Sequence, residues 1–165
     1  MLCLAVFFPI VAGLLLLGAK PLSRRTREYC IEGVTIATSL MVLLCLLEPA
    51  KEPAVAFMLM QDMPIAFHLD GLGSVFAGLI AFLWPLATLY AFEYMEHEGG
   101  ETHFFALYTI TYGVTLAIAT SANIMTMYIF YEFLTVCTLP LVMHGTSRES
   151  VRAGHQYMMY SFIGA

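Results

Sequence analysis

The stretch GLGSVFAGLIAFLWPLATLYAF, from Gly71 to Phe92, carries no charged side chain and decides the class of fold. The hydrocarbon core of a bilayer is about 30 Å thick, and a helix of about 20 mainly apolar residues crosses it. This stretch meets that length and is bounded by Asp70 and Glu93. It therefore predicts a membrane-spanning helix.

Similar apolar stretches on both sides of Gly71–Phe92 extend this prediction to the whole chain. A sixth stretch begins near Ala153 and stops at Ala165, which is too short to cross the bilayer. The other expected spans are Leu2–Ala19, Tyr29–Leu47, Phe104–Thr120 and Asn123–Met143. We therefore predict an all-α polytopic bundle with about five complete spans and a truncated sixth, forming one transmembrane domain over residues 1–165.

The composition agrees with lipid as the solvent and excludes several classes of function. Of the 165 residues, 60% are hydrophobic and 12% are charged, whereas a soluble domain carries about 45–50% apolar and about 25% charged residues. The net charge of −5 leaves no basic face for nucleic acid. The cysteines lie in or beside apolar runs, form no CxxC or Cys/His pattern, and are interpreted as buried apolar residues. They are Cys3, Cys30, Cys45 and Cys137. No metal, cofactor or redox motif is found, so any oxidoreductase activity would belong to an assembly.

The distribution of basic residues predicts the orientation of the chain. A cleaved signal peptide carries its positive charges before the apolar run, but here they follow the first run. Positive residues favour the cytoplasmic side of a membrane protein, so we expect the N-terminus outside a bacterial-type inner (plasma) membrane. This orientation leaves only Lys51 outside. The basic residues that it places inside are Lys20, Arg24, Arg25, Arg27, Arg148 and Arg152.

The outer connection after the second span contains two short apolar runs, Ala54–Met60 and Ile65–Leu69. Because the turn residues Gln61, Asp62, Met63 and Pro64 separate them, they predict a small β-hairpin on the outer surface. A surface helix opened by Pro64 is the alternative.

The connection after the third span is strongly acidic and also carries His97 and His103. Acidic residues contribute little to orientation, so we interpret this connection as a solvated loop. A cation or partner site is the alternative. Its acidic residues are Glu93, Glu96, Glu98 and Glu101.

Glu132 is the only acidic or basic residue that lies deep in a predicted span. Such a residue costs about 2.5–3.5 kcal/mol at the centre of a helix on insertion scales, and it normally faces a partner or a hydrated cavity. Tyr128 and Thr135 share its helix face because they lie four residues before and three residues after it. The opposite side is predicted to be lipid-like. Its residues are Phe130, Phe133, Leu134, Val136 and Cys137.

Two interpretations of Glu132 stay open. The functional one is a carboxylate that handles protons or cations, with a basic partner on another span, supported by Tyr128 and Thr135. His144 and His155, at the inner ends of the fifth and sixth spans, are candidate relay groups. The structural one is a protonated glutamic acid that hydrogen-bonds a neighbouring helix.

Three segments give the chain a resemblance to a known family. Phe67–Leu72 (FHLDGL) is similar to a Phe-x-Leu-Asp-Gly entry to the third span, Asn123–Glu132 (NIMTMYIFYE) to a fifth span, and Ala153–Tyr157 (AGHQY) to the start of a sixth. The chain thereby resembles the N-terminal portion of the antiporter-like subunits of respiratory complex I. That family includes the large subunits of multisubunit sodium/proton antiporters and of membrane-bound hydrogenases.

The resemblance implies a long helical bundle in which Glu132 matches a fifth-span glutamate that pairs with a lysine on the seventh span. Gln156 stands where many relatives carry lysine, and the seventh span is not among these 165 residues. The implied function is a proton- or sodium-translocating subunit of a complex I-like NADH:quinone oxidoreductase, a hydrogenase or a cation/proton antiporter. Its implied partners are other membrane subunits. A non-transporting structural subunit and an inactive truncated product are the alternatives.

Overall fold

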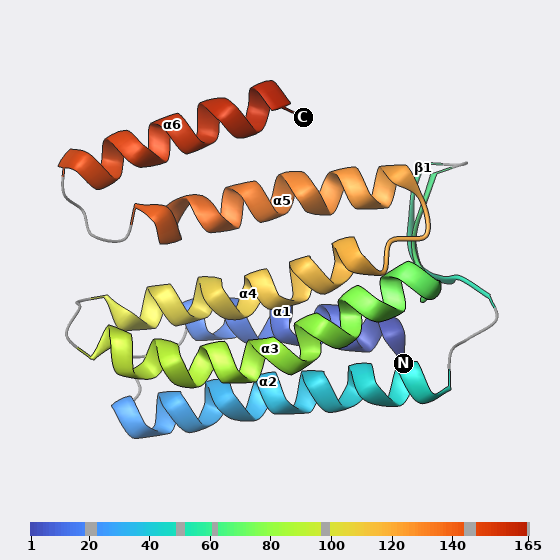
Figure 1. Cartoon of the computed structure of the whole chain (residues 1–165), viewed down its shortest axis with the longest axis horizontal. Helices are drawn as coiled ribbons and strands as arrows, with labels where there is room; N and C mark the ends of the chain where they lie inside the picture. The colour runs from blue at the N-terminus through green and yellow to red at the C-terminus, as the bar shows by residue number, and fades with distance from the viewer. Residues whose placement is uncertain (19–22, 49–51, 61–62, 97–99, 144–147, 165) are drawn as a thin grey trace.

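The computed structural model describes residues 1–18, 23–48, 52–60, 63–96, 100–143 and 148–164. Figure 1 shows helices lying side by side, with a β-hairpin at one end of the bundle. The elements of the described residues are α1 (Leu2–Gly18), α2 (Arg24–Leu47), β1 (Ala54–Met60), β2 (Met63–Phe67), α3 (Gly71–Met95), α4 (Glu101–Ala119), α5 (Ile124–Val142) and α6 (Arg148–Gly164). The predicted all-α membrane bundle with a small hairpin is confirmed.

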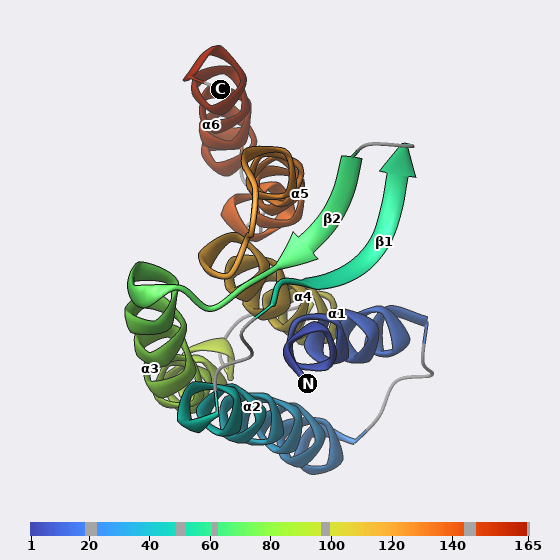
Figure 2. The same cartoon turned by 90° about the vertical axis from the view of Figure 1, so that its right-hand side faces the viewer.

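Four of the described helices, α2 to α5, are long and apolar enough to cross a membrane, and α1 is a shorter apolar helix. Of these four, α4 is the most enclosed, with 56% of its apolar window buried against 22% for α3 and α5. Helices α1 and α5 both pack closely on α4, and α4 lies between them in the end-on view (Figure 2). The chain is therefore a multi-pass membrane protein organised around α4.

Two glycines let α1 and α4 approach each other closely. A Cβ atom added to Gly13 would lie 2.6 Å from the carbonyl oxygen of Ala106, and one added to Gly113 would lie 2.5 Å from that of Val6. Small residues at such crossings allow close van der Waals packing, which drives helix association in lipid.

The charged ends of the helices extend further than the apolar stretches predict. Helix α2 begins at Arg24 instead of Tyr29. The Ser23 side chain caps it by accepting from Thr26 N at 3.4 Å, and Arg24 pairs with Glu28 one turn later at 2.7 Å. A polar first turn with these contacts is stable as a helix without apolar residues. Hydropathy alone therefore places the start of this helix too late.

The two strands form an antiparallel pair in which Ala54 lies opposite Phe67 and Met60 lies opposite Met63. The hairpin prediction is therefore confirmed, and the surface-helix alternative is wrong. The second strand is Met63–Phe67 and not Ile65–Leu69. It includes Pro64, which a two-stranded sheet tolerates because an edge strand does not need every N–H group. The predicted turn residues Gln61 and Asp62 lie outside the described residues.

Hydrogen bonds attach the hairpin to the connection between α4 and α5. His68 N donates to the Thr120 carbonyl at 2.7 Å, and Ala122 N donates to the Ala66 carbonyl at 2.9 Å. Ala66 N also donates to the Thr126 hydroxyl at 3.2 Å. Figure 2 shows the hairpin beside α4 and α5, so these bonds fix the ends of both helices against the sheet.

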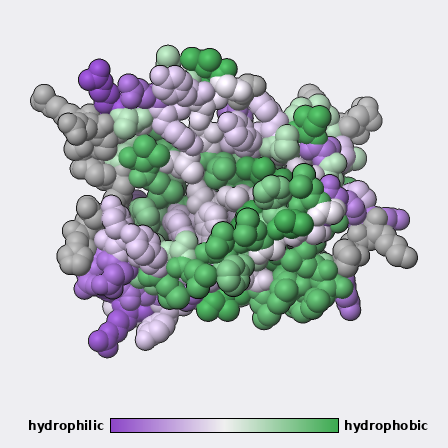
Figure 3. Space-filling model, in the orientation of Figure 1, coloured by the Kyte–Doolittle hydropathy of each residue, from purple (hydrophilic) through white to green (hydrophobic). Residues whose placement is uncertain are grey.

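The outer surface of α2 and α3 is apolar, as lipid contact requires. Figure 3 shows a hydrophobic band over these helices and hydrophilic side chains at the two ends of the bundle. Leu40, Leu43, Leu79 and Phe82 are among the exposed side chains on this surface.

Candidate functional site

Asn123 fixes the start of α5 and thereby the depth of Glu132. Its Oδ1 atom accepts from Thr126 N at 2.7 Å, and its Nδ2 atom donates to the Pro64 carbonyl at 2.9 Å. Glu132 lies eight residues after Ile124 in a 19-residue helix, which is about 12 Å along it. The Glu132 Oε1 atom is buried and has no hydrogen-bond partner among the described residues.

The predicted supporting residues share the helix with Glu132 but do not bond to it. Thr135 is buried and donates to the Tyr131 carbonyl at 3.3 Å, while Tyr128 is 47% exposed. Within the described part of the chain, no hydrogen bond joins either residue to Glu132. His155 is exposed on α6, and His144 lies outside the described residues. The supporting and relay roles therefore stay predictions.

The helix side opposite Glu132 packs partly inside the protein. Phe130 and Cys137 are buried, and the Phe130 ring lies 5.6 Å from Phe67 and 6.4 Å from Phe7, between ring centroids. The prediction of a lipid-like side is wrong for these two residues, although Phe133 and Val136 are exposed. Apolar side chains suit lipid and protein neighbours alike, so hydropathy cannot choose between them.

Helix α6 lies alongside α5, as Figure 1 shows. The hydroxyls of Thr138 and Tyr157 lie 2.8 Å apart, and Gly154 lies against Met143. These two contacts show that the helices are antiparallel. Moving from Thr138 back to Glu132 on α5 therefore corresponds to moving from Tyr157 towards Gly164 on α6. Glu132 is level with the last turns of α6.

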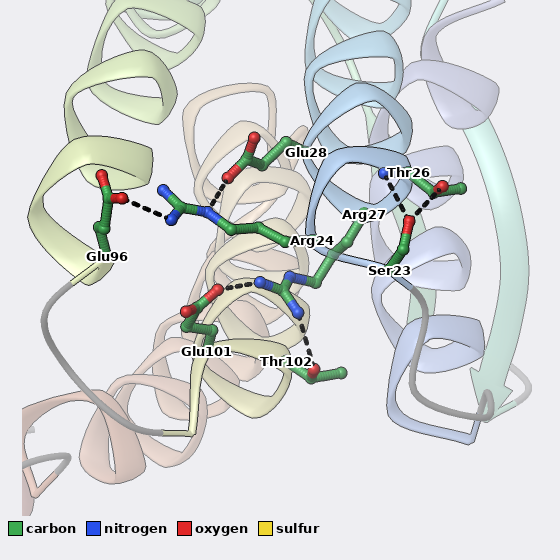
Figure 4. A network of polar contacts seen from close by, with 8 residues as sticks. All are labelled: Ser23, Arg24, Thr26, Arg27, Glu28, Glu96, Glu101 and Thr102. Atoms are coloured by element: carbon green, nitrogen blue, oxygen red, sulfur yellow. Dashed lines mark hydrogen bonds and ion pairs between the residues drawn. The ribbon is translucent and has the colours of Figure 1, made fainter.

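The acidic connection after α3 is paired with the start of α2 (Figure 4). Arg24 lies 2.8 Å from Glu96, and the buried Arg27 pairs with Glu101 and donates to the Thr102 hydroxyl at 3.4 Å. The solvated-loop interpretation is therefore wrong for Glu101, because helix packing brings the buried Arg27 to it, whereas Glu96 is paired and still exposed. His97 and Glu98 lie outside the described residues.

Glu32 is a partly buried carboxyl that the sequence reasoning missed. Since α2 begins at Arg24, Glu32 lies two turns inside the helix, and its Oε2 atom is buried without a hydrogen-bond partner among the described residues. Glu32 therefore joins Glu132 as a carboxyl with one buried, unpartnered oxygen. The capping pattern of Ser23 and the spacing of Arg24 and Glu28 were the available signals of the earlier helix start.

The Phe-x-Leu-Asp-Gly segment has a clear structural role. Asp70 caps α3 because its Oδ1 atom accepts from Gly73 N at 2.6 Å. A Cβ atom on Gly73 would lie 2.6 Å from the Ala119 carbonyl oxygen, so a glycine there permits close contact between α3 and the end of α4. Among the described residues, no cluster of three or more His, Cys, Asp or Glu side chains is arranged to hold a metal.

The helix order and the hairpin together define a multi-pass α-helical membrane protein. The sequence model of the family described as "NADH-Ubiquinone oxidoreductase (complex I), chain 5 N-terminus" matches residues 57–105. NAD(P)H-quinone oxidoreductase subunit 5 from chloroplasts of Glycine max is 30% identical over 81 residues, which are 49% of this chain and 11% of that protein. The same subunit from Lemna minor is 29% identical over 95 residues, 58% of this chain and 13% of that protein.

Solved structures share the fold over nearly the whole chain. A chain of respiratory complex I from Thermus thermophilus with bound NADH gives a TM-score of 0.80 at 24% identity, over 99% of this chain and 33% of that one. A chain of the membrane-bound sulfane sulfur reductase, an archaeal respiratory membrane complex, gives 0.80 at 16% identity, over 99% of this chain and 34% of that one. The resemblance to the antiporter-like subunits is therefore confirmed. The chain spans about a third of the length of these solved chains.

Proposed function

We propose that this chain contributes helices to an ion-translocating membrane subunit and that protons or sodium ions pass through Glu132. The assembly would be a complex I-like NADH:quinone oxidoreductase, a hydrogenase or a cation/proton antiporter. Two findings support this: the similar proteins include subunit 5 of NAD(P)H-quinone oxidoreductases, and the solved neighbours come from respiratory membrane complexes. Other membrane subunits would be its partners and would carry out any redox chemistry.

The observation that carries the proposal is the buried, unpartnered Oε1 atom of Glu132. A carboxylate in a low-dielectric interior is costly unless an opposite charge lies near it. A lysine on another span, as the resemblance implies, would stabilise the charged form of Glu132, and its withdrawal would favour the protonated form. A change in the distance between the two groups would then load and release one proton.

The structural alternative requires a hydrogen bond to a neighbouring element. The elements packed on α5 are α4, α6 and β2, and the described residues of these elements provide no partner for the buried oxygen. This absence of a partner favours ion handling over a structural hydrogen bond.

The test is Glu132→Gln in the assembled complex, because glutamine keeps the volume and hydrogen-bonding capacity but cannot ionise. We expect near-normal assembly with strongly reduced ion pumping, and partial activity for Glu132→Asp. Complex abundance should be measured on the same membranes as flux. Normal pumping by an assembled Glu132→Gln complex would leave only the structural interpretation. An inactive truncated product would give no flux even with Glu132 intact.

We also propose an orientation in a bacterial-type inner membrane with the N-terminus outside, which places the start of α2 in the cytoplasm. It rests on the six-to-one division of positive charges along the sequence. A cysteine at Ser23, the exposed cap of α2, should react with an impermeant thiol reagent only after the cells are opened. Labelling of that cysteine in intact cells would reverse the orientation.

A further inference from the structure

We propose that Glu32 is a second proton-binding carboxyl, held in a polar cluster between α2, α3 and α4. The proposal is independent of the role of Glu132, because α2 packs on α1, α3 and α4, whereas α5 packs on α4, α6 and β2. The cluster, called here the α2–α4 polar cluster, consists of Glu32, Thr35, Ser39, Thr88, Tyr108 and Tyr112.

The depth of Glu32 places it in the apolar part of the bundle. Helix α2 has 24 residues, a length of about 36 Å, against a hydrocarbon core of about 30 Å. Glu32 is eight residues from Arg24, about 12 Å along the helix. With α2 centred in the bilayer, Glu32 lies about 9 Å inside the hydrocarbon boundary, where an unpaired carboxylate is costly.

The hydroxyl groups of the cluster are engaged with backbone carbonyls and with one another. Thr35 donates to the Glu32 backbone carbonyl at 2.9 Å, and Ser39 donates to the Thr35 carbonyl at 2.9 Å. The Tyr112 hydroxyl, 2.8 Å from Ser39, is then the donor of that pair. The Thr35 hydroxyl also lies within hydrogen-bond reach of the Glu32 side chain, and because a hydroxyl both donates and accepts, it can accept from a protonated carboxyl.

Near this end of the bundle, two basic residues of α2 make ion pairs with carboxyls other than Glu32. On α2 itself, Arg24 pairs with Glu28 and Glu96, and Arg27 pairs with Glu101 of α4. None of the ion pairs among the described residues includes Glu32.

The neighbouring helices present neutral groups to Glu32. Helix α4 contributes Tyr108, which is close enough to interact electrostatically with Glu32 and lies beside Thr88 of α3. Glu93 of α3 is exposed, and α1 carries no Asp, Glu, Lys, Arg or His. With no ion pair among the described residues to stabilise the carboxylate, the uncharged acid is the form that these surroundings favour, and one proton binds to one carboxylate oxygen.

Trp84 provides a built-in probe of this site because it is the only tryptophan in the chain. Its ring stacks on Tyr112 at 4.9 Å and lies 5.3 Å from Tyr108, between ring centroids. A charge that appears or disappears at Glu32 should therefore change the emission of Trp84.

The experiment titrates the 165-residue chain in lipid nanodiscs with pH while recording Trp84 emission and the infrared carbonyl stretch of protonated carboxyls. We expect a single-proton step in the emission that Glu32→Gln abolishes. Glu28→Gln is the matched control, since Glu28 lies one turn earlier on α2 and pairs with Arg24. Glu28→Gln and Glu132→Gln should both retain the step.

Two results for Glu32→Gln would overturn the proposal. One is an emission step of full size, and the other is an infrared carboxyl band identical to that of the unsubstituted chain. If circular dichroism shows that Glu32→Gln is unfolded, Tyr108→Phe decides, because it keeps Glu32 and removes a neighbouring hydroxyl. The carboxyl band should then shift, and an unmoved band overturns the proposal. Because Glu132→Gln is tested separately, failure of this site and failure of the Glu132 proposal are distinguishable.

Discussion

The two ends of the bundle are held together by different kinds of contact. At one end, called here the charged end, α2 and α4 begin and Arg24 and Arg27 pair with Glu96 and Glu101 (Figure 4). At the other, the hairpin end, the strands lie beside the connection between α4 and α5 (Figure 2). Neutral hydrogen bonds and a buried ring cluster hold them there.

This difference predicts that the hairpin end is rigid and that the charged end is adjustable. Exposed ion pairs contribute little and weaken with salt, whereas buried rings and backbone hydrogen bonds are insensitive to salt. The hairpin end fixes the start of α5 and hence the depth of Glu132. The charged end lies two turns from Glu32. We therefore expect substitutions at the two ends to have effects of different size and salt dependence.

The largest effect is expected for Phe67→Ala at the hairpin end. The Phe67 side chain is fully buried and contacts the rings of Phe7 and Phe130, so its loss should lower the free energy of unfolding by about 3–5 kcal/mol. The measurement is unfolding of the micelle-bound chain by sodium dodecyl sulfate, followed by circular dichroism. Phe57→Ala is the control, since Phe57 lies on the same hairpin and is 49% exposed. Equal losses for both variants would mean that the ring cluster does not anchor the hairpin.

The next effect is expected for Arg27→Gln at the charged end. Removing the buried guanidinium leaves the half-buried Glu101 without its partner, which should cost about 3 kcal/mol. The same unfolding assay applies, and Glu101→Gln in the Arg27→Gln background should recover part of the loss. Arg24→Gln is the control, because Arg24 is exposed and its pairs should contribute little. If Arg24→Gln and Arg27→Gln are equally harmful, burial is not what makes the Arg27 pair strong.

The smallest effects are expected for substitutions of the helix-cap residues at the two ends. Asn123→Ala removes both the cap of α5 and the bond to the Pro64 carbonyl, and should cost about 2 kcal/mol. Ser23→Ala removes only the longer, exposed cap of α2 and should cost about 0.5 kcal/mol. Hydrogen exchange of the first turns of α5 and α2 measures each effect locally. A larger effect at Ser23 would reverse the assignment of rigid and adjustable ends.

Local patterns in the sequence were sufficient for the membrane class, the helices and the hairpin. These features depend on runs of apolar residues and on a turn, both of which act over a few neighbours. Asp70 and Asn123, in the motifs that carried the resemblance, cap α3 and α5, so those motifs also encode local structure. The helix starts at Arg24 and Glu101 were missed because polar first turns carry no hydropathy signal.

Only the tertiary structure decided which side chains of similar character meet. Phe130 and Val136 are equally apolar in the sequence, yet Phe130 is buried among rings and Val136 is exposed. Arg27 and Glu101 are 74 residues apart and meet through the packing of α2 beside α4. The same packing buries one oxygen of the Glu32 carboxyl. The physical reason lies in two different choices. Whether a side chain leaves water for the membrane depends on its own chemistry. Whether it then contacts lipid or protein depends on the shapes of helices that are far apart in the chain.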